Sequence, residues 1–123
     1  MKTQKPDIQY LGLRAVRNFP NHAFFPFIEK IHQKEIKRTG GINHPQIRML
    51  YQAIVQYKSI QSKKLLQKTL VKTKDWWNRK THSEYIWLAL YKFPDLLYDE
   101  IQKQFRLEDY EIRDLKHLKN VEN

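Results

Sequence analysis

The stretch that decides the fold is THSEYIWLALYKFP, residues 81–94. Thr81 and Glu84 are three residues apart, which is the spacing of a capping box that opens a helix. The segment that follows is apolar almost all round, as expected for a central, buried helix. The Phe-Pro pair ends it, because the residue before a proline is biased out of helical geometry. We therefore expect a central helix here, with Trp87 in the core.

Helix signals recur on the N-terminal side of this stretch, whereas the period-two alternation typical of strands is nearly absent. Asp7 is expected to cap a first helix that ends near Arg17, and Asn21 is expected to cap a second. Gly40-Gly41 is the clearest break in the chain and indicates the end of that second helix. The N-terminal third therefore predicts two helices.

A third helix is expected to begin near Pro45, because proline suits the first turn of a helix. Another helix is expected over about residues 62–80. No Gly or Pro lies between the two, so residues 45–80 fit one continuous helix as well as two. Two more helices are expected after Pro94, the last over about residues 107–119.

These elements predict an all-α fold without a sheet, a compact bundle or irregular array of five to seven helices. The 123 residues suit a single domain over residues 1–123. A chain of this length buries enough surface to fold without a disulfide or a metal. It contains no cysteine, which excludes thiol nucleophiles and Cys-ligated zinc.

Charge is distributed unevenly along the chain, whose formal net charge is +10. Residues 42–83 form a basic segment with nine Lys or Arg and one acid, Asp75. Residues 84–123 form an acidic C-terminal third, with nine acids against six Lys or Arg. A field of one sign attracts an oppositely charged partner. The charge pattern therefore predicts a polyanionic partner, foremost a nucleic acid.

The most informative part of the basic segment is SKKLLQKTLVKTKDWWNRKTH, residues 62–82. On one continuous helix, at about 100° per residue, Lys64, Lys68, Lys72 and Arg79 fall on one side and the leucines on another. A lysine row at i, i+4 and i+8 spans about 12 Å, enough to meet several phosphates. The predicted polyanion-binding residues are Lys63, Lys64, Lys68, Lys72, Lys74, Arg79 and Lys80.

The Trp76-Trp77 pair follows the lysine row. On a helix the two side chains point about 100° apart, so equal burial of both is not expected from geometry alone. Placement of both in the core is the plainer interpretation. An exposed member would instead stack on a base or anchor the chain in a pocket of a partner protein.

These patterns leave three hypotheses open. The leading one is a non-enzymatic protein that binds DNA or RNA through its phosphate backbone. The alternative is a helical adaptor, subunit or inhibitor whose basic face binds an acidic protein. The third is a solvated face that the acidic third neutralises, within one chain or between copies in a homo-oligomer.

No pattern for catalysis, a metal or a cofactor is present. The five histidines are scattered and include no HExxH spacing, and there is no glycine-rich phosphate loop. The first ten residues hold no signal-peptide core. The longest apolar run, Tyr85 to Tyr91, is far shorter than the roughly 20 residues that span a bilayer. We expect a soluble, cytoplasmic protein without enzymatic activity.

Overall fold

The computed structural model describes residues 4–73 and 75–104, and within them the chain is all-helical, as predicted. The helix expected over residues 107–119 lies outside the described residues. The elements, in chain order, are α1 (Gln4–Asn18), the 3-10 helix η1 (His22–Phe24), α2 (Phe25–Lys37), α3 (His44–Gln56), α4 (Ile60–Lys72), α5 (Trp76–Lys92), the 3-10 helix η2 (Leu96–Tyr98) and α6 (Asp99–Gln104).

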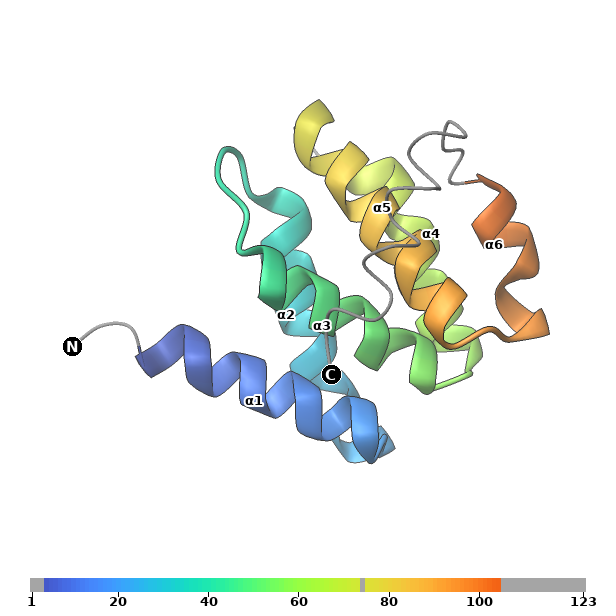
Figure 1. The fold of residues 1–123 in the computed structure, drawn as a ribbon, viewed down its shortest axis with the longest axis horizontal. Helices are drawn as coiled ribbons and strands as arrows, with labels where there is room; N and C mark the ends of the chain where they lie inside the picture. The colour runs from blue at the N-terminus through green and yellow to red at the C-terminus, as the bar shows by residue number, and fades with distance from the viewer. Residues whose placement is uncertain (1–3, 74, 105–123) are drawn as a thin grey trace.

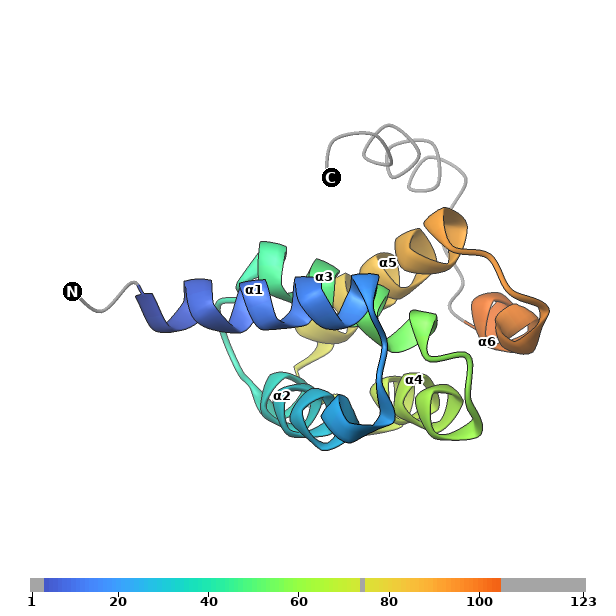
Figure 2. The ribbon, with the colours of Figure 1, turned by 90° about the horizontal axis from the view of Figure 1, so that it is seen from below.

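Helix α3 lies between α1 and α5 (Figure 1), and the view turned by 90° separates the helices into two layers (Figure 2). Figure 2 shows α2 and α4 side by side below α1, α3 and α5, with α6 next to α4. Helix α3 packs against α1, α2, α4 and α5, and it is buried over most of its circumference. Its buried apolar side chains are Ile47, Met49, Leu50, Tyr51, Ala53, Ile54 and Val55.

The central helix is therefore α3 and not the segment after Glu84. Helix α5 does bury Ile86 and Leu90. Trp87, however, is only half-buried, and its ring stacks on that of Tyr91 with 5.2 Å between centroids. The prediction that Trp87 is a core residue is wrong, because α5 borders the core on one side only.

The helix boundaries in the N-terminal half are largely as predicted. Gly40, at φ +88°, follows the end of α2, and Asn43 caps α3 with a proline in its first turn. Asn21 caps η1, and α2 begins one turn later, so Pro26 falls in the first turn of α2. The predicted cap Asp7 is wrong, because α1 already begins at Gln4.

The single helix predicted over residues 62–80 is wrong, because α4 ends and α5 begins within it. Asp75 interrupts it: its Oδ1 accepts the N–H of Trp77 at 2.9 Å and so caps α5. Thr81 lies inside α5, where its hydroxyl donates to the Trp77 carbonyl at 3.1 Å. The capping box predicted at residues 81–84 therefore opens no helix.

Residues 45–80 contribute to three helices. The break between α3 and α4 needs no Gly or Pro, since Lys58 takes up φ 51° and Ser59 caps α4. The hydroxyl and backbone of Ser59 exchange hydrogen bonds with Ser62, which makes a capping box from two serines. This cap fixes the point at which α4 starts.

A buried polar network joins four helices at the centre of the molecule. His32 Nε2 on α2 lies 2.9 Å from the Thr69 hydroxyl on α4. The Tyr51 hydroxyl on α3 lies 3.3 Å from that same hydroxyl and also bonds His82 Nδ1 on α5. All four side chains are buried. Each hydroxyl and one ring nitrogen of each histidine has a partner in the network, whereas His32 Nδ1 and His82 Nε2 have none among the described residues. The network therefore fixes α2 and α4 against α3 and against each other.

The substitution Tyr51→Phe tests this network. It removes the partner of His82 Nδ1, and an unpaired buried polar group costs about 1–3 kcal/mol. We expect urea denaturation to show that the free energy of unfolding falls by that amount. The control is Tyr85→Phe, which removes a hydroxyl bonded to exposed His44. Equal stability of the two variants would contradict a structural role for the network.

Stability is expected to fall with acid. Burial lowers the pKa of His32 to about 3, helped by the charges of His82 and Lys68, and burial lowers that of His82 to about 4. In the unfolded chain both titrate near 6.5, so stability is full above that pH and falls as the pH drops toward 4. Each histidine contributes about 1.4 kcal/mol per pH unit in this window.

The measurement is the free energy of unfolding from urea titrations between pH 4.5 and 7.5. His82→Asn should reduce the slope with pH by about half, since one of the two buried histidines is removed. His44→Asn, at an exposed position, is the control. If the unfolding free energy of the parent protein did not change with pH across this range, the lowered pKa values of His32 and His82 would be refuted.

Candidate nucleic-acid interface

Three of the predicted lysines lie together on α4. Lys64, Lys68 and Lys72 are exposed and follow one another at i, i+4 and i+8. The opposite face of α4 is buried through Leu65 and Leu66. The division of α4 into a cationic and an apolar side is therefore as predicted, although the helix is shorter than expected.

Helix α2 adds three lysines that the sequence did not predict for this site. Lys30, Lys34 and Lys37 are exposed and fall within about 60° of one another around the α2 axis. Lys37 lines a groove of about 340 Å³ together with Lys68 and Lys72. We call the six residues Lys30, Lys34, Lys37, Lys64, Lys68 and Lys72 the lysine face.

The i, i+4 and i+7 spacing of Lys30, Lys34 and Lys37 was visible in the sequence. What the sequence lacked was the information that α2 and α4 pack side by side, which is a tertiary contact. The His32–Thr69 bond joins the two helices, which lie side by side in Figure 2, and Lys37 of α2 lines the same groove as Lys68 and Lys72 of α4. The face is therefore a product of packing between helices that are distant in sequence.

The charges of the lysine face are not paired within the described part of the chain. The ion pairs found there join Arg38 with Glu35, Lys58 with Asp95 and Lys63 with Glu100. In residues 4–73 and 75–104, the acidic third forms ion pairs with the basic segment through Lys58–Asp95 and Lys63–Glu100, each at 4.0 Å, and neither pair includes a residue of the lysine face. Lys37 and Lys72 also lie in last helical turns, where the helix dipole favours cations.

The other predicted cations do not join this face. Arg79 donates from Nη2 at 2.6 Å and from Nε at 3.2 Å to the Thr73 carbonyl, so it satisfies the C-terminal end of α4. Lys63 is partly buried beside α6, and Lys80 is half-buried on α5. Lys74 lies outside the described residues. The described members of the predicted cation set thus lie on α4 and α5. Some are exposed on the lysine face, and the others are partly buried or hydrogen-bonded within the fold.

Both tryptophans at the start of α5 are exposed, which corrects the prediction that both lie in the core. Trp76 is 60% exposed and Trp77 is 68% exposed. Their rings meet edge to face, with centroids 4.7 Å apart and an interplanar angle of 78°. The reason is the break at Asp75, which starts a new helix and turns its first residues away from the core.

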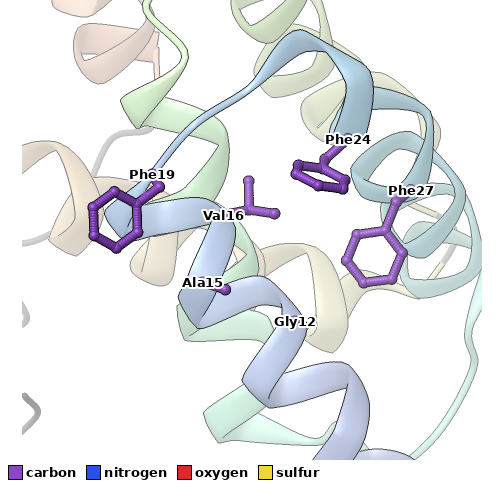
Figure 3. A pocket seen from close by; sticks show the side chains of 6 residues that line it. All are labelled: Gly12, Ala15, Val16, Phe19, Phe24 and Phe27. Atoms are coloured by element: carbon purple, nitrogen blue, oxygen red, sulfur yellow. The ribbon is translucent and has the colours of Figure 1, made fainter.

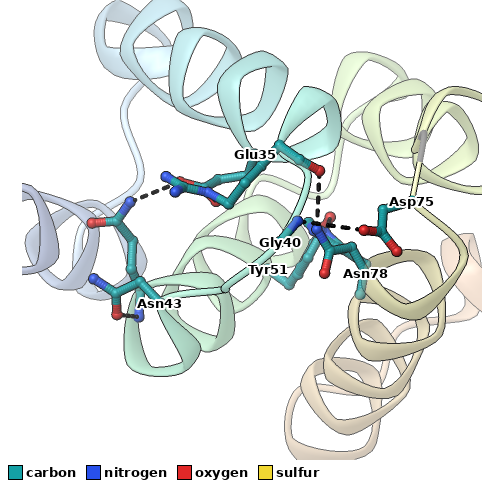
Figure 4. Close-up of polar contacts among 9 residues, drawn as sticks. Glu35, Gly40, Asn43, Tyr51, Asp75 and Asn78 are labelled. Carbon is teal, nitrogen blue, oxygen red and sulfur yellow. Dashed lines mark hydrogen bonds and ion pairs between the residues drawn. The ribbon is translucent and has the colours of Figure 1, made fainter.

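Polar contacts hold the start of α5 against the end of α2 (Figure 4). Asp75 Oδ2 accepts the Gly40 N–H at 3.4 Å. The Asn78 amide donates to the Arg38 carbonyl at 2.9 Å, and the Arg38 guanidinium is in turn bound by buried Glu35. The tryptophan pair therefore has a fixed position relative to the C-terminal end of α2.

A second surface feature lies between α1 and the start of α2 (Figure 3). It is an open apolar groove of about 460 Å³, and Phe19 beside it is 79% exposed. A Cβ at Gly12 would lie 3.1 Å from Phe27 Cζ, so glycine permits this close approach. The groove is lined by Gly12, Ala15, Val16, Phe19, Phe24 and Phe27. It offers no polar group and shares no residue with the lysine face.

Within the described ranges, no three His, Asp or Glu side chains gather closely enough to hold a metal ion. No helix in that part of the chain is long and apolar enough to cross a membrane. Comparisons with protein-family models, with curated proteins and with solved structures find no match for this chain.

Arg79 and Lys68 should differ in their effect on folding. Arg79→Ala leaves the Thr73 carbonyl without its two donors and should cost about 1 kcal/mol of unfolding free energy. Lys68→Ala removes only an exposed side chain and should stay within about 0.5 kcal/mol of the parent. Thermal unfolding followed by circular dichroism separates them. An unchanged melting temperature for Arg79→Ala would show that this cap is not formed.

Proposed function

We propose that this chain is a non-enzymatic nucleic-acid-binding protein that holds the phosphate backbone of DNA or RNA against its lysine face. The observation that carries the proposal is the presence of exposed lysines on the neighbouring helices α2 and α4, of which Lys37, Lys68 and Lys72 line one groove. None of the six forms an ion pair within the described residues. Such a surface attracts a polyanion over several ångströms.

The dimensions of the face fit a nucleic-acid backbone. Each lysine row runs for roughly 10–12 Å along its helix, and packed helices lie about 8–10 Å apart. Duplex DNA carries one charge per about 1.7 Å of its axis, so several phosphates fall within reach of the face. Every phosphate that a lysine neutralises releases condensed counterions, which favours binding at low salt.

The composition of the face favours phosphate over an acidic protein surface. All six of its cations are lysines, which act as flexible point charges and are established phosphate ligands. Lysine is depleted in protein–protein interfaces, where arginine is enriched instead. Lysine contacts with phosphates carry no direct sequence information, so the proposed binding is independent of base sequence.

Charge reversal on the lysine face tests the proposal. Lys68→Glu with Lys72→Glu should lower affinity for a labelled 20-residue oligonucleotide at least tenfold, since repulsion replaces two phosphate contacts. The slope of log affinity against log salt should fall by about 2. Fluorescence anisotropy across a salt series, with single- and double-stranded DNA and RNA, gives both quantities.

The matched control is Arg14→Glu with Lys103→Glu, which changes the net charge equally at exposed positions on α1 and α6. This control should retain most of the parent affinity and its salt slope. If both double variants lose affinity equally, attraction depends on net charge alone and the lysine face is not the site. Absence of binding by the parent protein at low salt would refute the function itself.

A further inference from the structure

The tryptophan pair is an exposed aromatic surface that the proposed backbone contacts do not use. Large aromatic side chains contribute most to stability when they are buried. Two neighbouring indoles that are each more than half exposed are therefore unusual. Because the rings meet edge to face, the edge of one indole contacts a single face of the other, and the remaining broad faces are not covered by the pair itself. Aromatic faces of this kind are the surfaces on which unpaired nucleobases stack.

The pair lies at one end of the lysine face. Trp76 is four residues beyond Lys72, the last residue of the α4 lysine row. The Asp75 carboxylate binds the Trp77 N–H through one oxygen and the Gly40 N–H through the other, and Gly40 is three residues beyond Lys37. The tryptophans therefore adjoin the C-terminal ends of both helices that carry the lysines.

From this juxtaposition we infer that Trp76 and Trp77 form a stacking subsite for unpaired bases, so that the protein prefers single-stranded nucleic acid. The inference rests on the proposed function, because the lysine face must hold the backbone that presents those bases. Bases within a duplex are already stacked on their neighbours and cannot reach an indole without being unstacked. A single strand offers its bases freely, and stacking on indole is indifferent to sequence.

Hydrogen bonds at the residues that flank the pair support this role. The Asp75 cap and the Asn78–Arg38 bond fix the backbone on both sides of the pair. The edge-to-face contact restrains the two rings against each other, and a restrained platform loses less conformational entropy when a base stacks on it than a single free side chain would. The lysine stems remain flexible and can follow the irregular backbone of a single strand.

The test compares two ligands with the same backbone charge: a 15-residue oligothymidylate and a 15-residue abasic oligomer that lacks the bases. The parent protein should bind oligothymidylate about tenfold more tightly, which corresponds to one stacked base. Trp76→Ala with Trp77→Ala should abolish that difference and leave affinity for the abasic oligomer unchanged. Trp76→Phe with Trp77→Phe should retain part of it, since phenylalanine also stacks.

The outcomes separate this inference from the proposed function. If the parent binds both oligomers equally tightly, the stacking subsite is refuted and backbone binding stands. If the parent binds neither oligomer, both are refuted. Lys68→Glu with Lys72→Glu should weaken binding of both oligomers, and Trp87→Phe, at a half-buried position away from the turn, should change neither. Circular dichroism of each variant confirms that the helical fold is intact.

Discussion

The hydroxyl of Thr69 is the point on which the arrangement of the helices depends. It lies within hydrogen-bond distance of His32 on α2 and next to Tyr51 on α3, and Tyr51 continues the network to His82 on α5. Apolar contacts alone tolerate small shifts of one helix along another. A buried hydrogen bond does not, because a displaced donor or acceptor is left without water and without a partner. The network therefore sets the register of α2 against α4.

That register has a consequence at the surface. Thr69 points into the core, whereas Lys68, its neighbour in sequence, borders the groove that Lys37 also lines. The buried contact at Thr69 thus determines which lysines lie next to one another on the surface. Loss of the network should weaken the alignment of the two lysine rows, even though all members of the network are buried. The expected link between stability and the proposed binding is therefore geometric.

Much of the fold could be predicted from local signals, and the interface could not. Gly40 and the proline after Asn43 marked real helix boundaries because each acts through its own backbone chemistry. The break at Asp75 was missed because no Gly or Pro marks it, although aspartate favours helix N-caps over helix interiors and caps α5 through its bond to Trp77. That error placed Arg79 on the lysine row and the tryptophans in the core. The lysines of α2 were missed because only tertiary packing brings them beside those of α4.

The most direct test of the lysine face is a footprint of lysine reactivity. Acetylation with an N-hydroxysuccinimide ester, read by mass spectrometry with and without a bound 20-residue oligonucleotide, shows which amines the ligand covers. We expect strong protection of Lys37, Lys68 and Lys72, and unchanged reactivity at Lys103. Protection spread evenly over all lysines, or none at those three, would contradict a binding face formed by α2 and α4.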